Sequence, residues 1–364
     1  MKKMPAILIV VFFIVCGCMP APSEQPLPDT PLPMPTEAPI SQYLCFIAAN
    51  ESEFEQYLYH GMLAFCGMHE LRHGYYHEPI PMDAVHAAAS DGATVIVAGG
   101  LWFEDVFQYA QGLYPHIQFL LMDAEPYTFE LPFHITQNTH AVLFWEEQAG
   151  FLAGYAAVQT GYTQLGFLGG MAVPDVVRYG YGFVMGADAA AVELGITADV
   201  SIRYWYAGSF QPNDATEARM AEWYATGTEL VFCCGLDIYD SCLAAADVTG
   251  GRIIGVMGTE FVRAANGISA VGNAILHTPQ ALIQALTTLM QNDWRWPETH
   301  AGKTAVLGVV EGAVALAVTE DGWRWRDITA EAYDALLSKL ASGELHVDYN
   351  DCGHFATIHV DYQD

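Results

Sequence analysis

Short apolar runs alternate with amphipathic stretches along most of the chain after residue 42. The first set of patterns predicts buried strands at 43–48, 94–98 and 117–122, and helices at 53–68, 103–113 and 147–159. The alternation then begins again, with strands expected at 164–168, 199–204, 230–233 and 252–256, and helices at 176–194, 215–226 and 238–247. Short buried strands that alternate with helices indicate parallel sheets covered on both faces. Two successive sets predict an α/β fold with two similar lobes.

The chain opens with Met1-Lys2-Lys3 and an apolar run over residues 6–15. A permanent membrane helix needs about 20 apolar residues, so this run is typical of a secretory signal instead. The run ends in Cys16-Gly17-Cys18, which resembles the lipobox of bacterial lipoproteins. That resemblance implies that residues 1–18 contain the signal, that Cys18 carries the lipid, and that the protein is anchored to the membrane and faces the extracytoplasmic side. The alternative is an ordinary cleaved signal with two incidental cysteines.

Proline dominates the stretch from 19 to 41, with Pro20, Pro22, Pro26, Pro28, Pro31, Pro33, Pro35 and Pro39. No helical or strand pattern persists at that density of proline. We therefore expect a semi-rigid tether of polyproline type, about 3 Å long per residue. No later stretch of 18 residues is apolar without polar interruption, so the sequence predicts no transmembrane helix.

The charge balance is strongly acidic, with 13 Lys+Arg against 42 Asp+Glu. Such a balance argues against nucleic acid as a partner and against docking on anionic lipid. The hydrophobic fraction of 52% is typical of a globular chain and not of an acidic disordered one. Six cysteines follow Cys18, and the sequence is compatible both with disulfides and with buried free thiols.

In parallel α/β sheets, ligands bind beyond the carboxyl ends of the strands. The residues that follow the predicted strands are Asn50, Phe54, Glu55, Gly99, Gly100, Trp102, Phe103, Asp123, Gly169, Gly170, Met171, Tyr206, Phe210, Gly235, Asp237, Thr259 and Glu260. Aromatic residues and glycines outnumber titratable groups in this set. That composition favours a planar, uncharged small molecule, and it offers no acid, base and nucleophile in mutual reach. We therefore expect neither an enzyme nor a cofactor.

Three stretches are similar to motifs of the basic membrane lipoprotein family. Residues 147–155 resemble its E-x-x-x-F-L-A-G-Y stretch, residues 166–178 its G-F-x-G-G-M-x-x-P-x-x-x-R stretch, and residues 206–210 its Y-x-G-S-F motif. The resemblance covers roughly 43–347 in the right order. It implies a substrate-binding protein of an ABC importer, often for purine nucleosides, with permease subunits as partners. It also implies a monomer with a type I periplasmic-binding-protein fold and a ligand cleft between its two lobes.

On that resemblance, lobe 1 comprises 42–158 and is rejoined by about 274–310. Lobe 2 comprises 159–273 and is rejoined by about 311–347. Residues 348–364 lie beyond the similarity as a C-terminal extension, whose role the sequence does not reveal.

The family's ligand-binding positions carry over unevenly. The expected ligand-binding set is Asn50, Phe54, Glu55, Trp102, Phe103, Asp123, Met171, Phe210, Gly235 and Met257. Glu55 replaces an asparagine that meets the base in the family, and Met257 lies in the turn where the family carries Asp residues. The family's lysine has become neutral near Gly272-Asn273. A carboxylate and a lysine that hold ribose are therefore both absent, which predicts a changed ligand, because losing only one of them would leave an uncompensated charge.

One local cluster suggests metal. Cys66, His69, His73 and His77 would share one face of a continuous helix, and thiol and imidazole groups bind zinc. Gly67 and Gly74 break such a helix, so we expect a polar surface turn and no metal. A membrane-tethered sensor that signals without transport, or a degenerate relative that does not serve transport, remains as an alternative function.

Overall fold

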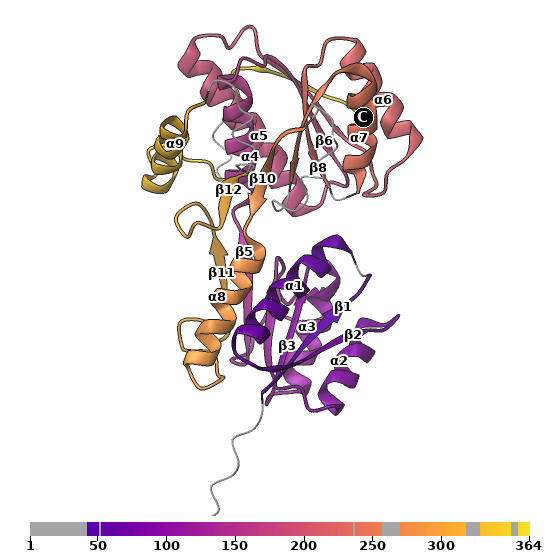
Figure 1. Cartoon of the computed structure of the whole chain (residues 1–364), viewed down its shortest axis with the longest axis vertical. Helices are drawn as coiled ribbons and strands as arrows, with labels where there is room; N and C mark the ends of the chain where they lie inside the picture. The colour runs from indigo at the N-terminus through magenta and orange to yellow at the C-terminus, as the bar shows by residue number, and fades with distance from the viewer. Residues whose placement is uncertain (1–41, 51, 236, 257–269, 318–327, 351–355) are drawn as a thin grey trace, which may run out of the picture. The chain divides into compact units, whose positions relative to one another are not determined.

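The computed structural model describes residues 42–50, 52–235, 237–256, 270–317, 328–350 and 356–364 of the 364-residue chain. Strands in this part form two sheets, whose orders are β11-β5-β4-β3-β1-β2 and β12-β10-β9-β8-β6-β7-β13 (Figure 1). The chain passes from one sheet to the other after β5, after β10 and after β11. The expected Cys18 anchor and the proline-rich tether lie outside the described residues.

The first sheet contains β1 (Tyr43–Ala48), β2 (Arg72–His77), β3 (Val95–Gly99), β4 (Gln118–Met122), β5 (Thr139–Phe144) and β11 (Lys303–Leu307). All its neighbouring strands run parallel. Its helices are α1 (Glu53–Met68), α2 (Pro81–Ser90), the short 3₁₀ turn η1 (Leu101–Phe103), α3 (Glu104–Leu113) and α8 (Thr278–Gln291). Because β1, β3 and β4 are fully buried, they carry continuous apolar runs, as strands covered on both faces do.

The second sheet contains β6 (Gln164–Gly169), β7 (Ser201–Tyr206), β8 (Leu230–Cys234), β9 (Arg252–Val256), β10 (Ala270–Leu276), β12 (Val314–Leu316) and β13 (His359–Tyr362). Only β12, against β10, pairs antiparallel among the described strands of this sheet. Its helices are α4 (Glu146–Gln159), α5 (Pro174–Leu194), α6 (Asp214–Ala225), α7 (Ile238–Thr249) and α9 (Ala330–Ser342). Helix α4 packs against α5, β10 and β12, which are elements of the second sheet and its helices. The expected first lobe, in contrast, extended to residue 158 and so included almost all of α4.

Four glycines let α4 and α5 approach until their backbones touch. They are spaced four residues apart in each helix, at Gly150 and Gly154 in α4 and at Gly182 and Gly186 in α5. A Cβ on any one of them would overlap a carbonyl oxygen of the other helix. These four glycines therefore set the distance between the two helices, because any larger side chain would force them apart.

The contacts of these glycines also fix the direction of the two helices. Gly182 meets Glu147 at the beginning of α4, and Gly186 meets Phe151 one turn later. Residue numbers rise together on both sides, so α4 and α5 run parallel. Their amino-terminal ends consequently lie next to each other, and this places the side chains of their first turns in mutual reach.

The C-terminal residues complete the second sheet. Strand β13 pairs in parallel with β7. Just before it, Asp188 of α5 accepts hydrogen bonds at Oδ1 from the Thr357 amide and hydroxyl, both at 2.6 Å, and from the Ile358 amide at 3.0 Å. The extension that lies beyond the family resemblance is thus part of the fold.

The elements that were not predicted from the sequence are β2, α2 and β5 and, beyond residue 256, β10, α8, β11, β12, α9 and β13. Strand β2 is an edge strand with the polar sequence Arg-His-Gly-Tyr-Tyr-His, so it lacks an apolar run. In β5, the polar Thr139 and His140 are buried and interrupt the apolar pattern. The expected surface turn around His73 and His77 is wrong, because both residues belong to β2, whereas Cys66 is buried in α1.

Within the described residues there is no group of three His, Cys, Asp or Glu side chains that could hold a metal ion. Five cysteines are buried free thiols: Cys45, Cys66, Cys233, Cys234 and Cys242. None of the helices described combines the length and the apolar character needed to cross a membrane.

Candidate functional site

Asp123 and Phe54 lie where the strands of the first sheet end. Asp123 directly follows β4 in a left-handed conformation, with φ at 58°, and its amide donates to Val142 O at 2.7 Å. Phe54, at the start of α1, packs over the turn after β3, where a Cβ on Gly99 would lie 3.2 Å from its ring. Both residues keep the strand-end positions that the sequence predicts, and Asp123 is only partly buried.

Glu55 has a structural role in this conformation. Its carboxylate accepts from the Ala49 amide at 2.7 Å, the Asn50 amide at 3.2 Å and the Ser52 amide at 3.0 Å. Ser52 in turn accepts from the Glu55 amide, which completes a capping box at the start of α1. Asn50 is exposed, and its side chain accepts from the Ser52 amide. Ligand contact by Glu55 or Asn50 stays a prediction.

The two aromatic neighbours after β3 differ in environment. Trp102 is 68% exposed, whereas Phe103 is completely buried and packs edge-on against Phe107 in the core. Trp102 is therefore free to meet a ligand, and the geometry gives Phe103 a core position.

In the second sheet, Phe210 lies across two glycines. A Cβ on Gly170 would overlap its ring, and a Cβ on Gly235, whose φ is 140°, would lie 3.0 Å from it. Both positions therefore need glycine while Phe210 lies there. Met171 is 37% exposed beside them. Met257 lies outside the described residues.

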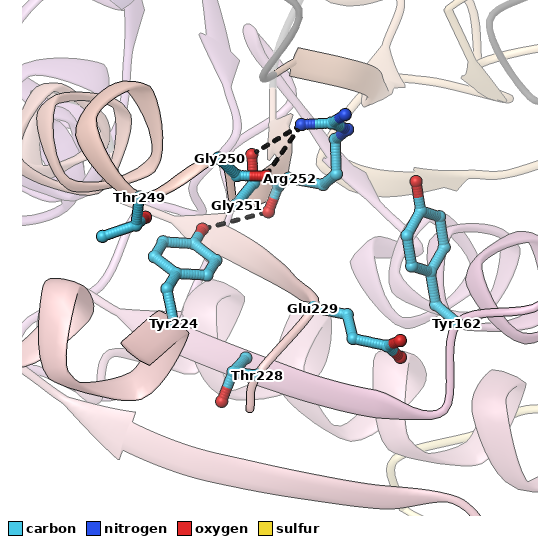
Figure 2. A pocket seen from close by; sticks show the side chains of 8 residues that line it. All are labelled: Tyr162, Tyr224, Thr228, Glu229, Thr249, Gly250, Gly251 and Arg252. Carbon is cyan, nitrogen blue, oxygen red and sulfur yellow. Dashed lines mark hydrogen bonds between the residues drawn. The ribbon is translucent and has the colours of Figure 1, made fainter. Parts of the chain in front are cut away.

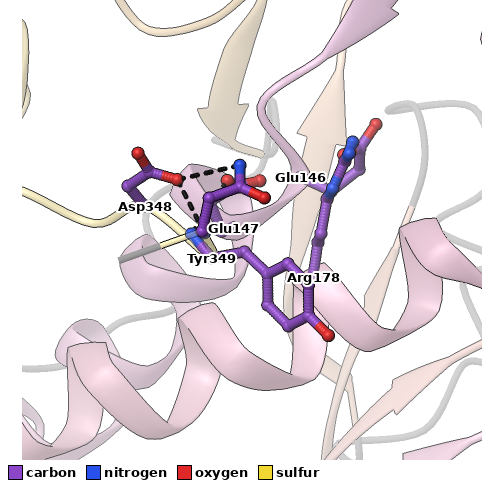
Figure 3. A network of polar contacts seen from close by, with 6 residues as sticks. Glu146, Glu147, Arg178, Asp348 and Tyr349 are labelled. Atoms are coloured by element: carbon purple, nitrogen blue, oxygen red, sulfur yellow. Dashed lines mark hydrogen bonds and ion pairs between the residues drawn. The ribbon is translucent and has the colours of Figure 1, made fainter. Parts of the chain in front are cut away.

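A group of carboxyl side chains gathers at the amino-terminal ends of α4 and α5. Glu146 is the first residue of α4, and Asp175 is the second residue of α5. Arg178, one turn further along α5, places Nη1 3.3 Å from Glu146 Oε2 (Figure 3). The side chain of Glu146 is 3% exposed and that of Arg178 is 30% exposed.

Asp123 belongs to the same electrostatic group. Burial and then the neighbouring Asp175 raise the pKa of Asp123 from its ordinary 3.8 to about 7, and Arg178 opposes the shift. Burial and then the charge of Asp123 raise the pKa of Glu146 well above its usual range. Burial likewise raises the pKa of Asp175, and the backbone amides of Val176 and Asp175 at the helix start oppose the shift. These carboxyl groups hold their protons more firmly than exposed ones do.

Glu147 extends this group toward the C-terminal segment. Its Oε1 accepts from the Tyr349 amide at 3.3 Å, and Asp348 lies nearby, as Figure 3 shows. Its Oε2 is buried and has no hydrogen-bond partner, and the same holds for Asp175 Oδ1. Burial raises the pKa of Glu147, and the Tyr349 amide and Arg178 oppose the shift. We refer to Asp123, Glu146, Glu147 and Asp175, with Arg178, as the carboxyl cluster.

The carboxyl cluster was not anticipated from the sequence, which favoured a largely uncharged site. Among its members, sequence reasoning selected Asp123 alone as a ligand contact. Glu147 and Arg178 were visible as motif residues, but their proximity depends on the parallel packing of α4 and α5. The pair Pro174-Asp175 does indicate the beginning of a helix, because proline is common at the first position of helices and acidic residues are favoured in the first turn. This signal could have placed Asp175 at a helix end.

A separate hollow of about 290 Å³ lies at the opposite, amino-terminal ends of the strands of the second sheet (Figure 2). Several of its polar groups already have partners within the protein. Glu229 Oε2 accepts from the Thr163 amide at 2.9 Å, and Arg252 donates to Gly250 O at 2.9 Å. The Tyr224 hydroxyl donates to Arg252 O at 3.0 Å. Ligands of parallel sheets bind at the carboxyl ends of the strands, so the carboxyl cluster is the better candidate site.

Comparison with known proteins identifies the family of this chain. The model of the PnrA-like ABC transporter substrate-binding proteins, Bmp, matches residues 54–336. The chain belongs to this family. Basic membrane protein A1 of Borrelia garinii subsp. bavariensis is 26% identical over 262 residues, which cover 71% of this chain and 72% of that protein. The ABC transporter nucleoside-binding protein BmpA of Lactococcus lactis subsp. cremoris is 23% identical over 193 residues, which cover 51% of each chain.

Solved structures agree with the fold. A solute-binding protein of an ABC transporter system from Aeropyrum pernix aligns with a TM-score of 0.68 at 16% identity, over 86% of this chain and 95% of that one. A second solute-binding protein, from Conexibacter woesei, aligns with a TM-score of 0.63 at 18% identity, over 84% and 98%. The predicted two-lobe α/β fold and the predicted family are therefore confirmed. The family consists of substrate-binding proteins of transporters and is not a class of enzymes.

Proposed function

We propose that this chain is the substrate-binding lipoprotein of an ABC-type importer. It captures a small planar solute, nucleoside-like in shape, and delivers it to permease subunits. Cys18 anchors it as a monomer to the membrane on the extracytoplasmic side, and the proline-rich segment acts as the tether. Membership of the family is the observation that carries the proposal, and the nucleoside-binding relative from Lactococcus lactis supports the solute class.

Two aromatic side chains at strand ends support a planar solute. Phe54 covers the turn after β3, and Phe210 covers the glycine surface formed by Gly170 and Gly235. Aromatic faces with a few polar anchors are typical of sites for flat ring systems. Asp123 and Trp102, at neighbouring strand ends, complete the proposed contacts.

The identity of the solute is tested by mass spectrometry of small molecules released from the denatured, freshly purified full-length protein. We expect one solute that contains a ring system, at close to one copy per chain. A thermal-shift panel of nucleosides and bases gives the complementary test. Absence of any released solute, together with no thermal shift from any nucleoside or base, would contradict the proposal.

A sensor or a degenerate relative without a transport role is the second candidate. The replacement of the family's acidic turn residue by Met257, and of its lysine near Gly272-Asn273, favours it. Uptake of the released solute in cells with and without the gene separates the two. Uptake that does not depend on the gene favours the sensor.

A further inference from the structure

The charges of the carboxyl cluster would not balance if all its groups were ionised. The guanidinium of Arg178 acts on all four of its carboxyl groups, those of Asp123, Glu146, Glu147 and Asp175. With all of them ionised, four negative charges would surround one positive charge. A buried network of this kind is stable only when its charges are paired or its carboxyl groups hold protons.

The hydrogen bonding of the cluster is incomplete as well. Asp175 Oδ1 and Glu147 Oε2 have almost no contact with solvent and no hydrogen-bond partner. Nearly all buried polar atoms in folded proteins have such a partner. A network that served only to join α4 to α5 would not need these two oxygens, since the close packing of four glycines already joins the helices. The unpaired oxygens are therefore acceptors without a donor.

The cluster lies beside the aromatic part of the candidate site. The Cys234 thiol, at the end of β8, lies within electrostatic reach of Asp175 and Glu146. The next residue, Gly235, packs against the Phe210 ring. An aromatic surface and a surplus of carboxyl groups thus occur at the same end of the second sheet.

We propose that the carboxyl cluster binds a positively charged nitrogen group, an ammonium or an amidinium, that is attached to the planar solute. This inference rests on the proposed role as a substrate-binding protein and specifies the chemistry of its ligand. Asp175 Oδ1 supplies the free acceptor, Asp123 approaches from the end of β4, and the Glu146–Arg178 pair holds the first turns of α4 and α5 in place. A cation restores the charge balance of the cluster and gives its unpaired acceptors a donor.

The raised pKa values agree with this assignment. Without a cation, burial and mutual repulsion favour the protonated form of Asp123, Glu146 and Asp175. A bound cation favours their charged form, so binding releases protons from the cluster.

Benzamidine and benzamide test the inference as a matched pair, because they have nearly the same shape and only benzamidine is a cation. Binding to the full-length protein, purified in detergent and stripped of its solute, is measured by calorimetry at about pH 8. We expect benzamidine to bind at least about tenfold more tightly than benzamide. Equal affinities, tighter binding of benzamide, or no binding of benzamidine would overturn the inference.

Asp175→Asn removes one charge at almost constant shape, and it should reduce the preference for benzamidine by about tenfold. Asp83→Asn is the matched control, because Asp83 also lies in the first turn of a helix that begins with proline but is exposed. Asp83→Asn should leave the preference unchanged. Since the benzamidine–benzamide comparison is made on the unaltered protein, the test stands even where Asp175→Asn fails to fold.

The released solute separates this inference from the proposed function. A bound nucleoside without positive charge, combined with failure of benzamidine, would retain the substrate-binding function and refute the cationic ligand. Absence of any bound solute and of any nucleoside or base binding would instead refute the proposed function.

Discussion

Arg178 Nη1 lies 3.3 Å from Glu146 Oε2, and the two side chains come from the first turns of two parallel helices. Parallel helices place their positive amino-terminal dipole ends side by side, which is unfavourable in the absence of negative charge. Glu146 and Asp175 place carboxyl groups at the two helix ends, and these groups supply that charge when they are ionised. The same pair of carboxyl groups forms part of the candidate site.

Replacing Arg178 by methionine should destabilise the protein by about 2 kcal/mol, since it removes the cation beside the nearly fully buried Glu146, while the partial exposure of Arg178 limits the loss. Urea denaturation followed by circular dichroism measures the change. Arg295→Met, at an exposed position, is the control and should change the free energy of unfolding by less than about 0.5 kcal/mol. Equal effects of the two substitutions would contradict the role of Arg178.

Gly154→Ala should destabilise the fold by about 1 to 3 kcal/mol, because the added methyl group would overlap the carbonyl oxygen of Phe183 and force α4 away from α5. Gly67→Ala is the matched control, since it makes the same change in helix α1 with no atom within 4 Å. The control should stabilise the protein by about 0.5 to 1 kcal/mol. Denaturation midpoints compare the two, and a neutral Gly154→Ala would show that the helices can separate without cost.

The protonation of Asp123 should make the stability of the solute-free protein depend on pH. Because the pKa of Asp123 in the folded protein, about 7, lies above its ordinary 3.8, its stabilising contribution is complete below about pH 4 and disappears as the pH rises through 7. Between these limits, the unaltered protein should lose up to about 1.4 kcal/mol per pH unit relative to Asp123→Asn. Denaturation at several pH values measures this difference. Asp199→Asn, at an exposed position, is the control and should show no such difference from the unaltered protein. Parallel curves of unfolding free energy against pH for Asp123→Asn and the unaltered protein would disprove the prediction.

Asp188→Ala should loosen the C-terminal strand. The substitution removes the acceptor of three hydrogen bonds from Thr357 and Ile358, which should cost about 1 to 3 kcal/mol. Hydrogen exchange should become faster in β13 and in its partner β7, and remain unchanged in β1 of the first sheet. Asp334→Ala, on the exposed side of α9, is the control. Unchanged exchange in β13 would show that Asp188 does not hold the segment.

Local sequence patterns predicted the elements whose cause is local. Helix α1 begins after Ser52 and ends at Met68, as expected, because its capping box and apolar face lie within one stretch of sequence. Strand β7 spans Ser201–Tyr206, two residues later than the predicted 199–204, and boundaries of this kind depend on the neighbouring strands. Edge strand β2 was not predicted, because its sequence is polar and its hydrogen bonds depend on β1.

The candidate site was only partly predictable for a related reason. The rule for strand ends selected Asp123, which follows β4 directly, and Phe210, which lies four residues after the end of β7. Glu146 and Asp175 could not be selected in the same way, because they meet through the packing of two helices that are separate in sequence. Burial of several carboxyl groups also contradicts the usual preference of such groups for the surface, so composition favoured the opposite conclusion.

Strand β13 also affects how the protein behaves at high concentration. Without it, β7 would present an open row of amide and carbonyl groups, flanked by the aromatic Tyr204 and Trp205, to any other chain. Exposed strand edges of this kind promote pairing between molecules and aggregation. With β13 in place, the outermost strand spans only His359–Tyr362 and carries the charged Asp361. We therefore expect the resistance of the folded protein to self-association to depend on a segment outside residues 54–336, the stretch that the family model matches.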